Sequence, residues 1–111
     1  MTPASYNITI PQRADFSLDL QLKDSTGTPL NMNGYTVEAE IWTERRTNKL
    51  ADMVVTWTDR PIGKLNLSIP SSVTSTITTT GVWDLLVVSP SNKRNYWIRG
   101  KTALAVGYTD V

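Results

Sequence analysis

Apolar and polar residues alternate with a period of two along most of the chain, which is typical of β-strands with one buried face. In ADFSLDLQLK, residues 14–23, every second position from Phe16 to Leu22 is a large apolar residue. YTVEAEIWTE, residues 35–44, alternates in the same way, with Thr36, Glu38 and Glu40 on its polar face. Further strands are predicted over residues 6–10, 53–58, 65–69, 82–88 and 96–106. The chain is therefore expected to be all-β.

Residues typical of turns separate these predicted strands. Gly27 and Gly34 interrupt the alternation in KDSTGTPLNMNGY, and the runs TDRPIGK and SPSNKRN mark two tighter connections. The run SSVTSTITTT follows Pro70, and we expect residues 71–77 to form at most one helical turn. Seven short strands with a turn about every ten residues predict a two-sheet, immunoglobulin-like β-sandwich, with a small closed barrel as the alternative. We expect one domain spanning residues 1–111.

The last predicted hairpin, GVWDLLVVSPSNKRNYWIRGKTALAV, has apolar residues on both of its faces. Trp83, Leu85 and Val87 alternate onto one face, and Leu86 and Val88 alternate onto the other. A strand with one buried face needs only one apolar set. The first set is expected to close the core of the sandwich, and the second is surplus to it.

Two tryptophans extend this surplus set. An immunoglobulin-like strand order places residues 35–43 in the same sheet as the hairpin. Trp42 is out of phase with the inward residues of its strand, and Trp97 is out of phase with Ile98. We therefore predict an apolar patch on the outer face of this sheet, formed by Trp42, Leu86, Val88 and Trp97.

Such a patch is rarely left bare in a soluble protein, and aromatic anchors dominate protein–protein interfaces. We predict an interface here, with three basic residues at its rim: Arg94, Arg99 and Lys101. Coverage of the patch by a loop or by the N-terminal segment is one alternative. A platform on which sugar rings stack against exposed tryptophan is the other.

Composition argues against catalysis and against a metal site. The chain has no Cys and no His, so it lacks a thiolate nucleophile, a disulfide and the commonest general base. Most acidic residues alternate with apolar ones or lie in turns, as on a solvated sheet face. Asp15, Asp19 and Asp24 do not have the spacing of a calcium-binding loop. We predict no enzymatic activity, no cofactor and no metal.

The charge balance argues against nucleic acid and membrane as partners. The formal net charge is only +1, so no global attraction toward polyanions is expected. Basic residues do lie beside Tyr96 and Trp97, a mixture found in proteins that bind single-stranded nucleic acid, but no recognisable motif accompanies them. No apolar run approaches the ~20 residues that span a bilayer, and the opening MTPASYNITI does not read as an export signal.

The order of these features resembles a short immunoglobulin-like module of tailed-bacteriophage virion proteins. YNITIPQRADFSLDLQLKDSTGTPLNMNGYTVEAEIW is similar to the opening of that family, including a D-x-x-G-x-P-x-x-x-x-G-Y loop. GKLNLSIPSSVTSTITTTGVWDLLVVSPSNKRNYWIRGKTAL is similar to its second half. There a short helical crossing leads to a strand with Trp83 at a position that is often Tyr, and then to a closing strand with an internal glycine, Gly100.

The resemblance implies a structural part of a virus particle without catalytic activity. The implied placement is tail, baseplate or fibre attachment, including the N-terminal domain type of upper baseplate proteins. The protein would be assembled into the virion in the host cytoplasm, with other virion proteins and further copies of itself as partners. A capsid decoration (cement) protein and a carbohydrate-binding host-adhesion module are the alternative functions.

Overall fold

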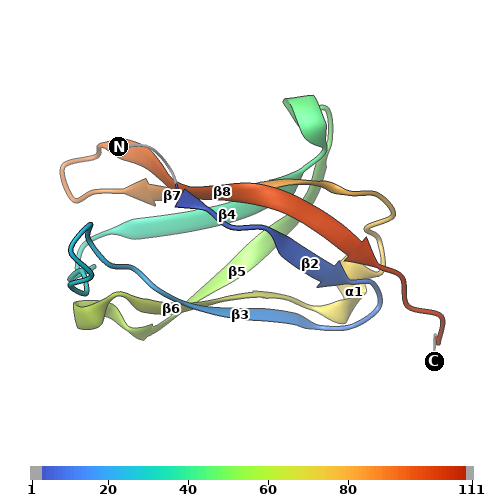
Figure 1. Cartoon of the computed structure of the whole chain (residues 1–111), viewed down its shortest axis with the longest axis horizontal. Coiled ribbons are helices and arrows are strands. Elements are labelled where there is room, and N and C mark those ends of the chain that lie inside the picture. The colour runs from blue at the N-terminus through green and yellow to red at the C-terminus, as the bar shows by residue number, and fades with distance from the viewer. Residues whose placement is uncertain (1–3, 110–111) are drawn as a thin grey trace.

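Strands make up most of the chain in its computed structural model, which describes residues 4–109 (Figure 1). In chain order the described strands are β1 (Ala4–Ser5), β2 (Ile8–Pro11), β3 (Phe16–Gln21), β4 (Thr36–Trp42), β5 (Lys49–Asp59), β6 (Lys64–Ile69), β7 (Gly81–Val88) and β8 (Arg94–Ala105). The described helical turns are η1 (Glu44–Arg46), η2 (Arg60–Ile62) and α1 (Ser71–Thr74). Each predicted strand overlaps one of these strands, and α1 is the predicted helical turn.

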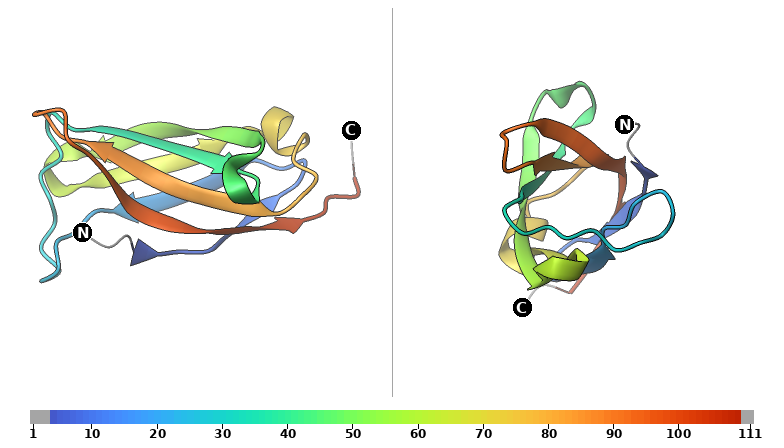
Figure 2. Two further views of the ribbon diagram at one scale, coloured as in Figure 1. Left: turned by 90° about the horizontal axis from the view of Figure 1, so that it is seen from above. Right: turned by 90° about the vertical axis from the view of Figure 1, so that its left-hand side faces the viewer.

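Two layers of strands face each other, and β5 belongs to both of them (Figure 2). One layer has the order β8-β7-β4-β5, with β1 and β2 running parallel along the free edge of β8. The other layer has the order β5-β6-β3. Residues 49–53 of β5 pair with β4 and residues 54–59 pair with β6, so one sheet curls into both layers. The predicted immunoglobulin-like sandwich is confirmed, as is the shared sheet of β4, β7 and β8.

The core lies between the layers and consists of the residues that alternate inward. Members that are nearly or fully buried come from both layers: Ala39, Ile41, Leu65, Leu67, Ile69, Trp83, Leu85 and Val87. Ile77, which follows α1 on the crossing between the layers, is also buried. Trp57 is half-buried against this core, with the Arg60 guanidinium 4.5 Å from its ring centroid.

A β-bulge interrupts the pairing of β7 with β8. Leu85 pairs with Ile98 and Leu86 pairs with Tyr96, so Trp97 is an extra residue on β8 that has no partner in this ladder. An inserted residue of this kind reverses the phase of a strand, because side chains on either side of it no longer alternate in one register. Tyr96 therefore shares the outer face with Leu86, whereas Ile98 shares the inner face with Leu85.

The bulge places Trp97 against the core. Its side chain is half-buried there, and its ring centroid lies 6.3 Å from that of Tyr35. The prediction that Trp97 belongs to the outer face is therefore wrong. Tyr96 occupies the outer position that the alternation assigned to its neighbour.

The N-terminal strand is split into β1 and β2 where it passes Gly100. A Cβ atom at Gly100 would overlap the carbonyl oxygen of Tyr6. That carbonyl accepts a hydrogen bond of 2.8 Å from the indole Nε1–H of Trp83, which is only 2% exposed. Asn7 Oδ1 accepts a hydrogen bond of 2.9 Å from the backbone N–H of Lys101. Because Gly100 has no side chain, the Tyr6 carbonyl can come close enough to accept the hydrogen bond from the buried Trp83 indole. The same close approach holds the N-terminal segment against β8.

Candidate docking surface

The outer face of the β4–β7–β8 sheet carries the side chains that alternate away from the core. Strand pairing aligns them in rows, and each row has one residue from β4, one from β7 and one from β8. In that order the rows are Thr36, Val88 and Arg94; Glu38, Leu86 and Tyr96; Glu40, Asp84 and Arg99; and Trp42, Val82 and Lys101. The β4 column therefore holds two glutamates, the β7 column is mostly apolar, and the β8 column is basic apart from Tyr96.

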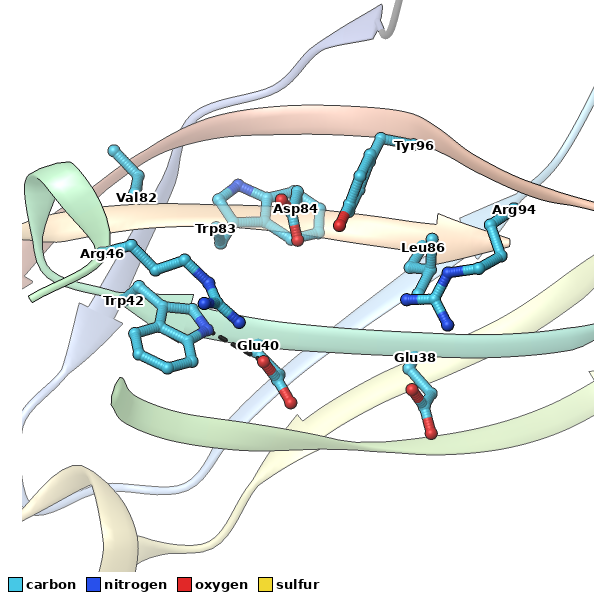
Figure 3. Close-up of a pocket in the computed structure, with 10 residues that line it drawn as sticks. All are labelled: Glu38, Glu40, Trp42, Arg46, Val82, Trp83, Asp84, Leu86, Arg94 and Tyr96. Atoms are coloured by element: carbon cyan, nitrogen blue, oxygen red, sulfur yellow. Dashed lines mark hydrogen bonds between the residues drawn. The ribbon is translucent and has the colours of Figure 1, made fainter. Parts of the chain in front are cut away.

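A groove of about 340 Å³ crosses this face (Figure 3). Leu86 lies in the groove and is only 8% exposed, whereas Glu38 and Arg94 are exposed on either side of it. Tyr96 also borders the groove and is 44% exposed. In place of the expected apolar patch there is thus a groove whose base combines Val82 and Leu86 with the acidic Asp84, and whose walls are charged or aromatic.

Trp42 points outward, as predicted, and has two charged neighbours. Its indole Nε1–H donates a hydrogen bond of 2.8 Å to Glu40 Oε1, and the Arg46 guanidinium lies 4.4 Å from its ring centroid (Figure 3). A cation above an aromatic ring is attracted by the electron-rich ring face. Arg45 and Arg46 both have left-handed backbone conformations, with φ of 66° and 58°, which are rare for residues other than glycine. The β4–β5 connection thus presents a cation to one side of Trp42.

Asp84 is the acidic residue of the otherwise apolar β7 column. It is half-buried and lies directly across from Glu40 on one side and Arg99 on the other. Burial raises the pKa of the Asp84 carboxyl above its ordinary value, the charge of Arg99 lowers it, and the charge of Glu40 raises it further. Like charges directly across a ladder are destabilising. Asp84 is therefore an unfavourable residue for the isolated fold.

The basic column of β8 borders a second groove, of about 540 Å³. Arg99, Gly100 and Lys101 line it together with Ser5 and Asn7 of the N-terminal segment. The β7 residues from position 82 to position 84 line both grooves. The two hollows therefore adjoin across β7, and together they extend over the width of the three-stranded face.

The structure brings most of the predicted interface residues onto this one face. Those it brings together are Trp42, Leu86, Val88, Arg94, Arg99 and Lys101. Trp97 is the exception. Sequence reasoning missed Tyr96, because a bulge leaves no mark in the alternation. It also passed over Glu38 and Glu40, although the polar phase of their strand already placed them outward.

The groups on this face are suited to recognition by contact. They offer aromatic surface, an apolar base and charges of both signs. Within residues 4–109 no group of three or more acidic side chains is arranged so that it could hold a metal ion. No helix in the same part of the chain is long and apolar enough to cross a membrane.

Comparisons with known proteins give one sequence family and a distant likeness in structure. The model of a family described as an LtfC-like, beta-sandwich domain matches residues 2–104. Comparison with curated proteins finds no significant match. Among solved structures, the crystal structure of the Lin-41 filamin domain is similar at 17% sequence identity and a TM-score of 0.45. That match covers 87% of this chain and 82% of the filamin-domain chain.

Proposed function

Because this chain belongs to the LtfC-like β-sandwich domain family, a phage tail-fibre type of domain, we propose that it is a structural component of a tailed bacteriophage particle. The match over residues 2–104 is the observation that carries this proposal. The proposed placement is the tail, at the baseplate or the fibre attachment. The mechanism is assembly by protein–protein contact, without catalysis, through the outer face of the β4–β7–β8 sheet.

The outer face supports an assembly role through its distribution of charge and apolar surface. Interfaces that form between folded proteins commonly have an apolar centre surrounded by polar and charged groups. Leu86, Val82 and Val88 give such a centre, interrupted by Asp84, and the glutamates of β4 and the basic residues of β8 flank it. Trp42 and Tyr96 provide aromatic contacts of the kind that contribute most to binding energy.

Immunogold labelling of purified particles tests the proposal directly. Particles of the phage that encodes the chain are labelled with antibody against the purified protein and viewed by electron microscopy. Label on the tail is the expected result, and label on the head would replace tail placement with the capsid-decoration alternative. A complete lack of the protein from purified particles, checked by mass spectrometry, would contradict the structural role.

A carbohydrate-binding adhesion role is the second candidate, and the aromatic residues beside the first groove favour it. Sugar rings stack on exposed aromatic faces, and Tyr96 is available for such a contact. Arg46 over the Trp42 ring makes that residue a poorer platform. A glycan array separates the two roles: specific binding by the wild type that is lost in Tyr96→Ala supports adhesion, and an array without signal argues against it.

A further inference from the structure

The charges on the outer face are sorted by strand. Glu38 and Glu40 lie on β4, and three of the four outward β8 positions are basic (Arg94, Arg99 and Lys101), with Tyr96 as the fourth. Between these columns the β7 column contains Val82, Leu86 and Val88 in addition to Asp84. The face therefore has an acidic side and a basic side separated by a mostly apolar centre.

Internal contacts leave much of this charge available. Lys49 Nζ lies 3.7 Å from Glu40 Oε2, so Glu40 already has one cation beside it, and the Arg46 guanidinium lies over the Trp42 ring. Glu38 is exposed and has no ion pair among residues 4–109. The same holds within those residues for Arg94 and Arg99. These groups can pair with charges on another molecule.

A two-fold axis can stack two such faces in two simple ways. If the axis runs across the strands, β4 lies over β4 and β8 lies over β8, so like charges meet. If the axis runs along β7, β8 of one copy lies over β4 of the other, so opposite charges meet at both sides of the contact. A two-fold contact uses the same patch on both subunits, and this patch complements itself only in the second arrangement.

We propose that a second copy of this chain docks on the outer face of the β4–β7–β8 sheet, related by a two-fold axis along β7. Glu38 of each copy then lies between Arg94 and Arg99 of the other, and Glu40 lies opposite Arg99. Lys101 lies opposite Trp42, whose aromatic ring attracts a cation. The apolar members of the β7 column, Val82, Leu86 and Val88, stack against their own counterparts at the axis.

Asp84 also meets its counterpart near this axis. Each Asp84 lies directly across the ladder from Arg99 of its own chain, so the basic column supplies a counter-charge on both sides. Opposite charges that meet at both sides of the contact suit a specific, moderately weak association, because electrostatic complementarity sets orientation more than affinity. The inference deepens the proposed assembly role by naming the partner, and it rests on that role.

A charge swap tests the arrangement. Sedimentation velocity is measured for the wild type, Glu38→Arg and Arg94→Glu from about 1 µM to about 1 mM, the range in which weak complexes dissociate. We expect the wild type to dimerise as its concentration rises. Each variant alone should dimerise about tenfold more weakly or worse, because it places like charges opposite each other twice per dimer. An equal mixture of the two variants should dimerise as the wild type does.

Lys23→Glu is the matched control, because Lys23 is exposed outside the sheet face and the substitution changes the net charge as Arg94→Glu does. It should leave dimerisation unchanged, and circular dichroism should show all variants folded. A wild type that stays monomeric, or a mixture that fails to regain the dimer, would overturn the inference. Immunogold label on particles would in that case still support the assembly role, so the two proposals can fail separately.

Discussion

At the scale of single residues, Gly100 has the clearest structural role. Gly100→Ala would push a methyl group into the Tyr6 carbonyl and break its hydrogen bond with the Trp83 indole. We expect a loss of about 2 kcal/mol or more in the free energy of unfolding, from steric strain and an unpaired buried N–H. Urea unfolding followed by tryptophan fluorescence measures this loss. Lys101→Ala, at an exposed neighbour, should change stability little, and an equal loss in both variants would contradict the assignment.

The charge of Asp84 should make the folded protein less stable at neutral pH than in acid. Because the pKa of its carboxyl is raised in the folded protein, mainly by burial, the ionised form opposes folding at neutral pH. This penalty disappears as the pH falls through the folded pKa to the ordinary value of 3.8. Asp84→Asn should therefore raise the melting temperature at pH 7. The gain in the free energy of unfolding should be less than about 1 kcal/mol, because solvent screens a half-exposed group. The gain should vanish at acid pH.

Asp24 should respond in the opposite direction and serves as the comparison. Hydrogen bonds from the Thr26 hydroxyl and from the backbone N–H of Thr28 and Thr26 lower the pKa of its exposed carboxyl. A lowered pKa contributes stability above the ordinary value of 3.8 that is lost as the pH falls through the folded pKa. Asp24→Asn should lower the melting temperature at pH 7 and have little effect in acid. Melting curves with the same sign for both variants would refute these assignments.

At the scale of elements, the bulge in β8 separates two adjacent aromatic residues by role. Trp97→Ala removes a side chain that packs on the core, and we expect a loss of about 2 kcal/mol, less than for a fully buried tryptophan. Tyr96→Ala, on the outer face, should cost less than about 1 kcal/mol. Chemical unfolding at low micromolar concentration, where each variant is monomeric, compares them. A larger loss for Tyr96→Ala would mean that the phase of β8 is the reverse of the one described.

Alternation in the sequence was sufficient to predict the strands, the inward faces of β4, β6 and β7, and the outward position of Trp42. It could not predict the position of Trp97, because a period of two carries phase only up to the first inserted residue. The acidic column of β4 was visible in the sequence. Its relation to the basic column of β8 became clear only from the register of both strands with β7.

At the scale of the whole molecule, the curled sheet gives the protein two unlike surfaces. β5 carries the chain from one layer to the other, so the core closes between the layers while the β4–β7–β8 face stays open outside. The N-terminal segment covers the edge of β8 but leaves the columns of charge exposed. The proposed assembly buries this open face inside the particle.

Cysteine accessibility measures this burial directly, because the chain has no natural Cys. Particles are assembled with Glu38→Cys or with the control Lys23→Cys, and labelling by a maleimide is compared between intact particles and dilute free protein. We predict that the thiol introduced at position 38 reacts readily in the free protein and is strongly protected in the particle, whereas the thiol at position 23 keeps more of its reactivity. Equal labelling at position 38 in particles and in free protein would show that the outer face is not buried on assembly.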